Sequence, residues 1–236
     1  MRIAATADLH FGKTSAGQLL PFLSQIATAA DVLLLCGDLT DYGLPEEARG
    51  LMKDLASAVH VPIVAVLGNH DFESGAEQDI RQILTDGGVI VLDGDSHEID
   101  NVGFAGVKGF AGGFGRGVLG PWGEQTVKLF VHEAVNETLK LESALARLRA
   151  EKKIVLLHYA PIAATVEGEP REIFPYLGCG RLEEPLGRYG VSAVVHGHAH
   201  KGCPEGRSST GIPVFNVALP LMRRTAPERP FRILDI

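Results

Sequence analysis

Five short apolar segments of this chain each end in side chains that can bind a metal ion or act as an acid or base. The segments are Ile3–Ala7, Val32–Cys36, Ile63–Leu67, Ile154–Leu157 and Val191–Val195. They are followed, in that order, by Asp8, Gly37-Asp38, Gly68-Asn69-His70-Asp71, His158 and His196-Gly197-His198-Ala199-His200. Short apolar runs that stop at polar clusters are typical of buried strands. The pattern therefore predicts a sheet whose chemistry gathers at the strand ends.

The segments between the first three strands have helical spacing. They are Gln18–Ala29 and Pro45–Val59, and the second begins with a proline suited to a first helical turn. The order strand, helix, strand, helix, strand predicts a parallel sheet with helices on both faces. Because ligands bind outside the carboxyl ends of the strands in such sheets, the polar clusters are placed where a site is expected.

The middle of the chain has a different character. Ile99–Val107 is predicted to be an antiparallel strand, and Gly103–Gly120, with eight glycines in eighteen positions, a mobile loop. Gly123–Lys152 has the strongest helical pattern, with leucines on one face and charges on the other. Pro213–Leu219 and Phe231–Ile236 are expected to be closing strands. No linker divides the chain, so residues 1–236 are expected to form one domain.

Charge and cysteine content narrow the possible partners. Lysine and arginine total 22 and aspartate and glutamate 29, a net charge of −7, which counts against a nucleic-acid partner. The three cysteines suggest no disulfide framework, so a reducing compartment is expected. No basic segment and long apolar run precede the first strand, and no stretch of about 18 apolar residues exists. We therefore expect a cytoplasmic protein with no membrane partner.

Oxygen and imidazole ligands without thiolate suit divalent manganese, iron, zinc or nickel. The candidates are Asp8, His10, Asp38, Asn69, His158, His198 and His200. Seven ligands are too many for one ion and about right for two. In extended backbone, alternate residues point the same way, so Asp8 with His10, and His198 with His200, can each grip one site. His196, which lies beside this motif, is left out of the metal set.

These motifs resemble those of the calcineurin-like metallophosphoesterase superfamily. The matching elements are Asp8-x-His10, Gly37-Asp38, Gly68-Asn69-His70-Asp71, His158 and Gly197-His198-x-His200, and they span residues 8 to 200. The compact chain is similar to small bacterial-type phosphoesterases related to cyclic-nucleotide phosphodiesterases. The resemblance implies an α/β fold, a two-sheet sandwich flanked by helices, with a dinuclear metal site at the carboxyl ends of the strands.

The resemblance also implies how the ligands are divided. One metal would be held by Asp8, His10 and His200, and the other by Asn69, His158 and His198. Asp38 would bridge the two ions. His70 would not be a ligand but would face the substrate phosphate, with Asp71 orienting it.

The implied activity is hydrolysis of phosphodiesters or phosphomonoesters of a small phosphorylated substrate, by in-line attack of a metal-bridging hydroxide. His70 would either protonate the leaving oxygen or stabilise phosphoryl charge, and the sequence leaves both roles open. One alternative is a scaffold or binding protein on the same fold, which usually loses ligands that this chain keeps. The other is a nuclease, against which the charge counts. Neither the substrate nor the oligomeric state follows from the sequence.

Overall fold

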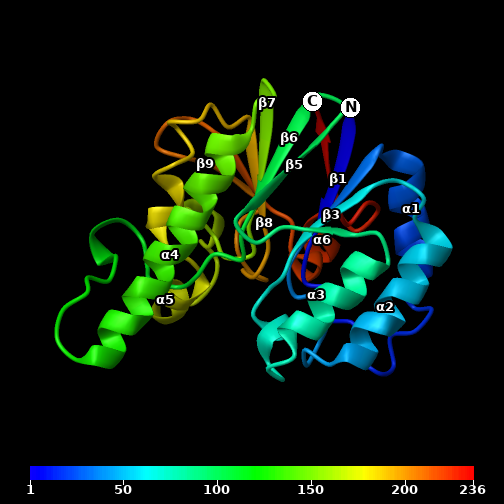
Figure 1. The fold of residues 1–236 in the computed structure, drawn as a ribbon, viewed down its shortest axis with the longest axis horizontal. Helices are drawn as coiled ribbons and strands as arrows, with labels where there is room; N and C mark the ends of the chain where they lie inside the picture. The colour runs from blue at the N-terminus through cyan, green and yellow to red at the C-terminus, as the bar shows by residue number, and fades with distance from the viewer.

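The computed structural model describes all 236 residues and contains two β-sheets that pack face to face (Figure 1). The first sheet has the strand order β11-β1-β2-β3-β4. Its strands are β1 (Arg2–Thr6), β2 (Val32–Cys36), β3 (Ile63–Val66), β4 (Ile90–Val91) and β11 (Arg232–Asp235). Strands β1 to β4 run parallel and β11 is antiparallel at one edge, so the first three polar clusters emerge at the same end of this sheet.

The second sheet has the order β5-β6-β7-β8-β10-β9. Its strands are β5 (Asp95–Ile99), β6 (Val102–Gly106), β7 (Lys152–Leu156), β8 (Ala193–His196), β9 (Glu205–Arg207) and β10 (Pro213–Asn216). The four inner strands are parallel, and the edge strands β5 and β9 are antiparallel to their neighbours. Strands β7 and β8 deliver the remaining two polar clusters.

Helices cover the outer face of each sheet (Figure 1). The first sheet packs against α1 (Leu20–Ala29), α2 (Pro45–Ala58) and α3 (Glu77–Asp86), and the second against α4 (Gln125–Arg147). The shorter helices are α5 (Phe174–Leu177) and α6 (Leu219–Thr225). Five 3₁₀ turns complete the fold: η1 (His70–Phe72), η2 (Gly115–Gly117), η3 (Ala163–Thr165), η4 (Arg171–Ile173) and η5 (Gly180–Glu183). None of these helices combines the length and the apolar character needed to cross a bilayer.

The core forms three layers, and this corrects one expectation from the sequence. In β2, Leu33 and Leu35 pack toward the helices, whereas Val32 and Leu34 pack against the second sheet. Each sheet therefore has helices on one face only. A strand that is apolar on both faces can be covered by a helix or by another sheet, so the alternation of strands and helices could not distinguish the two arrangements. The two-sheet sandwich implied by the family resemblance is the fold observed.

The central third departs most from the expected elements. Gly103–Gly106 belongs to the buried strand β6 and not to a loop, because its glycines let neighbouring side chains pack closely. The single strand expected at Ile99–Val107 is two antiparallel strands, β5 and β6, joined at Asp100 and Asn101, which both have positive φ. The long helix ends at Arg147, and Lys152 already starts β7.

Candidate metal centre

The parallel strands bring the polar clusters together. Thr6 of β1 lies beside Leu35 of β2, and Cys36 of β2 beside Val66 of β3. Leu156 of β7 pairs with Val195 of β8 in the facing sheet. The loops that follow these strands meet at one end of the sandwich, and both chain termini lie at the other end (Figure 1).

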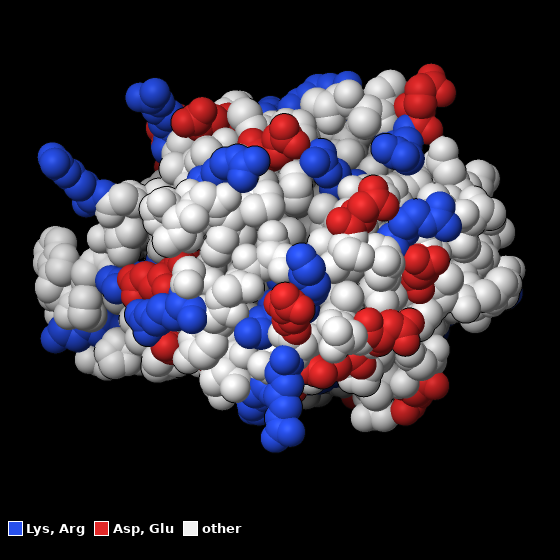
Figure 2. Space-filling view, turned by 90° about the horizontal axis from the view of Figure 1, so that it is seen from above, with Lys and Arg blue, Asp and Glu red and all other residues white.

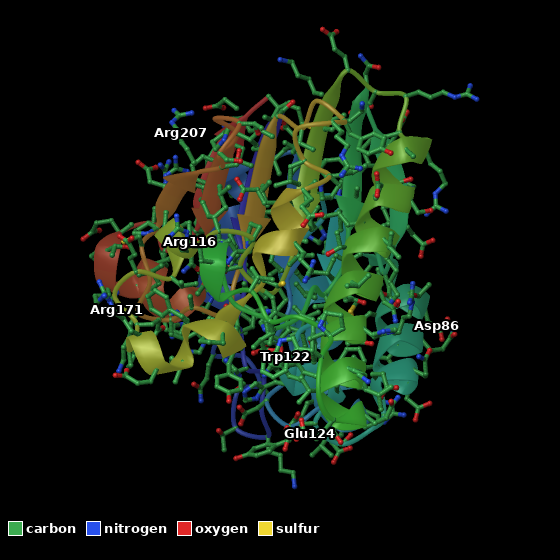
Figure 3. All side chains as sticks on the ribbon, turned by 90° about the vertical axis from the view of Figure 1, so that its left-hand side faces the viewer. Asp86, Arg116, Trp122, Glu124, Arg171 and Arg207 are labelled. Carbon is green, nitrogen blue, oxygen red and sulfur yellow. The ribbon has the colours of Figure 1, made fainter.

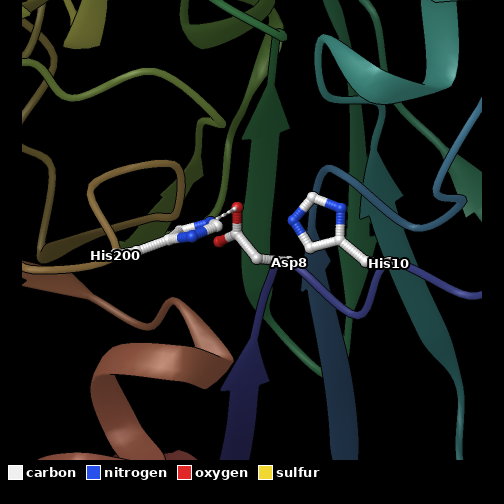
Figure 4. Close-up of side chains that lie close together, drawn as sticks. All are labelled: Asp8, His10 and His200. Carbon is white, nitrogen blue, oxygen red and sulfur yellow. Dashed lines mark hydrogen bonds and ion pairs between the residues drawn. The ribbon is translucent and has the colours of Figure 1, made fainter.

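The first group of potential ligands is Asp8, His10 and His200. Their ligand atoms all lie within 4.8 Å of one another, and Figure 4 shows Asp8 between the two imidazoles. His200 Nε2 lies 3.0 Å from Asp8 Oδ1. The Asp8 carboxylate is buried and also accepts a hydrogen bond from the backbone amide of His198 at 3.0 Å. This contact ties the loop after β8 to the loop after β1.

The second group is Asp38, His158 and His198, whose ligand atoms also lie within 4.8 Å of one another. His158 Nε2 lies 2.9 Å from Asn69 Oδ1 and 3.3 Å from Asp38 Oδ1. His158 Nδ1 lies 3.0 Å from the Cys36 carbonyl oxygen, which can only accept, so Nδ1 carries the proton. Nε2 faces two oxygen acceptors, Asn69 Oδ1 and Asp38 Oδ1, and is the nitrogen that a metal ion would bind once its proton is lost.

Asp38 lies between these groups. A third set of ligand atoms within 4.8 Å of one another is made by His10, Asp38 and His70, so Asp38 is a neighbour of residues from both sides of the site. His10 Nε2 lies 3.9 Å from Asp38 Oδ2, too far for a hydrogen bond, and this buried nitrogen has no hydrogen-bond partner. A buried imidazole nitrogen that has no hydrogen-bond partner and faces carboxylates is typical of a metal ligand. The side chains of this site therefore fit a divalent metal ion.

In the protein without metal, the buried carboxylates of the site stabilise positive charge on a neighbouring histidine. Burial would lower the pKa of His158, but the charge and hydrogen bond of Asp38 outweigh it and raise that pKa to about 9. Burial in turn would raise the pKa of Asp38, yet His158 holds it below its ordinary value. Burial and the nearby His158 lower the pKa of His198 to about 4. Without metal, a proton on His158 therefore supplies positive charge next to Asp38 and Asp8.

The backbone of the site differs from the extended geometry expected from alternate residues. Asp8, His10, Asp38 and His198 have φ values of 57°, 44°, 48° and 70°. Non-glycine residues rarely adopt this left-handed region, and clusters of such residues occur at functional sites. Asp8 and His10 do lie close together, as expected. Their proximity comes from the left-handed backbone of these two residues after β1, and not from a strand that continues past Asp8.

Two glycines make room for the ligands. A Cβ added at Gly68 would lie 2.2 Å from the backbone nitrogen and from Oδ1 of Asp38. One added at Gly37, which has a φ of 86°, would lie 2.5 Å from His158 Nδ1. The glycine before each of these two clusters is therefore required by close approach of the neighbouring ligand.

His70 lies beside His10 at the candidate metal centre. It opens the 3₁₀ turn η1, so the extended backbone assumed from the sequence is not present. Its Nδ1 lies 2.6 Å from the Asp41 carbonyl oxygen, which identifies Nδ1 as the protonated nitrogen. Its ring stands edge-on to the ring of His10, with centroids 4.5 Å apart. The half-buried His70 is thus oriented by Asp41, a residue that sequence reasoning missed although it lies only three positions after Asp38.

Asp71 makes no hydrogen bond to the His70 ring, which corrects the expectation that it orients the imidazole directly. Its fully buried carboxylate accepts hydrogen bonds from the amides of Gly68 (2.8 Å), Leu39 (3.2 Å) and Thr40 (2.8 Å), and from the Thr40 hydroxyl (2.6 Å). These donors lie in the loops after β2 and β3. Asp71 therefore holds together the two loops that carry Asp38 and Asn69.

Two histidines, one at the end of β8 and one in the loop after it, make contacts outside the candidate ligand groups. His196 is buried, with Nε2 2.8 Å from the Thr165 hydroxyl and Nδ1 2.8 Å from the Gly197 carbonyl oxygen. His198 Nε2 lies 3.2 Å from the Tyr176 carbonyl oxygen, which brings helix α5 to the rim of the site. Arg116 and Arg171, in segments that flank the site in sequence, are exposed at the surface (Figure 3).

A two-sheet sandwich with this cluster of carboxylates, imidazoles and one amide at its strand ends defines a metal-dependent phosphoester hydrolase. The chain belongs to the calcineurin-like phosphoesterase family, whose model matches residues 1–202.

Similar proteins extend over nearly the whole chain. UDP-2,3-diacylglucosamine hydrolase of Salmonella arizonae is 24% identical, covering 90% of this chain and 88% of the relative. The protein of the same name from Salmonella typhi is 23% identical with the same coverage. The crystal structure of TT1561 of Thermus thermophilus has a TM-score of 0.62 at 16% identity and covers 99% of this chain and 98% of that one. This structural likeness shows the fold.

Proposed function

We propose that this chain hydrolyses phosphodiesters or phosphomonoesters of a small substrate with two divalent metal ions. The first ion would be held by Asp8, His10 and His200, and the second by Asn69, His158 and His198, with Asp38 shared. The observation that carries the proposal is the position of Asp38, which neighbours His10 on one side and His158 and His198 on the other. The metals would come from manganese, iron, zinc and nickel, the ions that suit oxygen and imidazole ligands.

When bound, two such ions lower the pKa of water and neutralise phosphoryl oxygens. The protein keeps the net charge of the metal-loaded site positive by supplying few negatively charged ligands. Among the seven ligands, only Asp8 and Asp38 bring negative charge, whereas the other five are neutral imidazoles and an amide. A chain of net charge −7 can therefore hold a phosphate group.

His70 would act on the substrate directly. Because Nδ1–H donates to the Asp41 carbonyl oxygen, Nε2 is the nitrogen left to face the substrate. A neutral His70 would accept a proton at Nε2, and the doubly protonated form would donate one to a leaving oxygen or stabilise phosphoryl charge. Asp71 supports this role by fixing the turn on which His70 stands.

The alternatives are weaker on specific grounds. A scaffold protein would not need carboxylates and imidazoles whose ligand atoms lie within 4.8 Å of one another, as in the groups of Asp8 and Asp38. For a nuclease, a basic surface is expected, whereas this chain has a net charge of −7. On the end of the molecule that carries the chain termini, lysine and arginine are interspersed with aspartate and glutamate (Figure 2). The relatives' name points to a nucleotide-linked small substrate as one member of the class to test. We also propose a cytoplasmic location, because the three cysteines suggest no disulfide framework and so fit a reducing compartment.

The test is a substrate panel after metal exchange. Metal-free protein would be loaded with each divalent ion and assayed with bis-p-nitrophenyl phosphate, cyclic nucleotides, p-nitrophenyl phosphate and a nucleotide sugar. The expected result is turnover of at least one class that depends on metal and is lost in Asp38→Asn. Lack of turnover of every class by metal-loaded protein, or equal turnover by Asp38→Asn, would overturn the proposal.

A further inference from the structure

Lys108 lies beside the candidate metal centre without belonging to its ligand set. It follows β6, and its carbonyl oxygen accepts hydrogen bonds from the backbone amides of His158 (3.0 Å) and Tyr159 (3.1 Å). Its backbone is therefore fixed to the loop that carries a metal ligand. The residue is half-buried, so packing against its neighbours restricts where the side chain can lie.

The Lys108 ammonium lies over aromatic rings that border the site on two sides. Its Nζ is 5.3 Å from the ring centroid of Phe72, which comes two residues after His70. It is 5.4 Å from the ring centroid of Tyr159, and that ring in turn lies 4.6 Å from the ring of His198. The charge of Lys108 is thus held between the segment of His70 and the segment of His158.

Burial lowers the pKa of Lys108, and although the charges of Glu137 and Glu133 oppose that shift, no carboxylate forms an ion pair with this ammonium. Its one hydrogen bond is to the Gly109 carbonyl oxygen at 3.0 Å, and it forms no ion pair. An ammonium has three N–H donors, so two have no acceptor in the protein. The carboxylate of Glu137 instead accepts hydrogen bonds from the Gly109 amide (2.7 Å) and from Lys140 Nζ (2.8 Å). Aromatic faces offset only part of the cost of withdrawing an unpaired cation from water.

Lys108 also lines a cavity whose other two cations, Arg81 and Lys140, both form ion pairs, and Lys108 differs from them in forming none. The cavity has a volume of about 230 Å³ and lies between α3 and α4, with Glu77 and Glu133 also on its walls. In it, Lys140 pairs with Asp93 at 3.0 Å, and Arg81 pairs with Asp93 at 3.5 Å. This volume is below the roughly 300 Å³ of typical whole-ligand pockets, so it has room for one small group, and none of the candidate metal ligands lies on its walls.

We propose that Lys108 binds a second anionic group of the substrate, next to the phosphoester held at the metal centre. The inference rests on the proposed function. Metal ions would neutralise the reacting phosphoryl group, and a neighbouring phosphoryl group would need its own cation. Lys108 is a half-buried cation beside the site that forms no ion pair, whereas Lys13 and Lys201, which also form none, are exposed. The substrate class is therefore an ester in which two phosphoryl groups are linked, as in a diphosphate, and Lys108 is a specificity-determining residue.

The test compares a probe with one phosphoryl group and a probe with two. Inorganic phosphate and methylenediphosphonate would be titrated calorimetrically into protein of equal manganese content. The variants are Lys108→Met, which keeps the apolar stem and removes the charge, and Lys108→Arg, which keeps the charge. The control is Lys152→Met, because Lys152 is exposed at the start of β7, at the far end of the sheet, and makes no side-chain hydrogen bond or ion pair.

In Lys108→Met, we expect the affinity for methylenediphosphonate to fall about 10–100-fold more than the affinity for phosphate, as loss of a charge-assisted hydrogen bond requires. Lys108→Arg should restore most of the difference, and Lys152→Met should match the parent protein. Equal losses for both probes, or no loss, would overturn the role of Lys108. If Lys108→Met does not fold, Lys108→Gln gives the same comparison.

The two proposals fail in different ways. If the parent protein turns over a phosphoester and binds phosphate, but the ratio of the two affinities is unchanged in Lys108→Met, only the role of Lys108 is wrong. If metal-loaded parent protein neither binds phosphate nor hydrolyses any phosphoester, the proposed function is wrong and the role of Lys108 with it.

Discussion

The backbone amide of His70 donates a hydrogen bond to Asp38 Oδ1 at 2.8 Å. The same oxygen lies 3.3 Å from His158 Nε2. Asp38 thus contacts, through one atom, both the turn that presents His70 and a ligand delivered by the opposite sheet. The carboxylate that would be shared by the metals is also the residue that sets where His70 stands.

Replacing this carboxylate should be more damaging than removing a terminal ligand. Asp38→Asn removes negative charge next to both proposed ions, whereas Asn69→Ala removes one neutral ligand of one ion. We expect Asp38→Asn to lower kcat/KM at least about tenfold more than Asn69→Ala, and to lower metal content by more than one ion per chain. Steady-state kinetics and metal analysis of the two purified variants would show this. Equal, modest losses would argue that Asp38 is not shared.

His70→Gln should separate catalysis from metal binding. Because His70 faces the substrate and is not among the proposed ligands, metal content should stay at two ions while kcat falls about 10²–10⁴-fold. If His70 protonates the leaving oxygen, the loss should shrink for esters of p-nitrophenol, whose anion leaves without protonation. If it stabilises phosphoryl charge, the loss should be similar for all leaving groups. Loss of one metal ion from the variant would contradict the assignment.

Gly68→Ala should disrupt the site through a single methyl group. The added carbon would meet the Asp38 backbone and carboxylate at 2.2 Å, so the loops after β2 and β3 must move apart. We expect a decrease in unfolding free energy of about 1–3 kcal/mol and a loss of metal affinity. Gly117→Ala is the control, since nothing lies within 4 Å of its added carbon, and its effect should be within about 0.5 kcal/mol. Chemical denaturation of both variants measures the difference, and a stable, metal-replete Gly68→Ala would contradict the geometry.

Metal binding should release a proton from His158. Its pKa in the metal-free protein is raised to about 9, so His158 is protonated at about pH 7.5, yet a metal ligand must be neutral. The proton stabilises the metal-free fold fully below its ordinary pKa of about 6.5, and that contribution is lost as pH rises through about 9. Calorimetric titration with manganese in two buffers of different ionisation enthalpy should show release of about one proton per chain at about pH 7.5. Uptake of protons, or no release, would contradict the His158–Asp38 pair.

The principal strands and the polar clusters at their ends could be predicted because the physical signals are local. The strand Val32–Cys36 is a short apolar run stopped by Gly37-Asp38, and the structure gives the same bounds. Helix α3 gave a weak signal, since only Ile80 and Leu84 are buried in an otherwise polar segment. The face-to-face packing of the sheets gave none, because it depends on contacts between strands far apart in sequence.

The details of the site could not be predicted for a related reason. Alternation along a strand suggested how Asp8 and His10 point, but both have positive φ, a choice that tertiary packing imposes. Asp71 was assigned to His70 because they are neighbours in sequence. A buried carboxylate is instead bound by the nearest unpaired amides, and these come from Leu39, Thr40 and Gly68.

The number and position of metal ions test the account most directly. Crystals grown with manganese would be measured at a wavelength where the metal scatters anomalously. We expect two peaks per chain, one about 2 Å from ligand atoms of Asp8, His10 and His200, the other equally close to Asn69, His158 and His198, and both in contact with Asp38. A single peak, or two peaks that do not share Asp38, would contradict the two-metal centre.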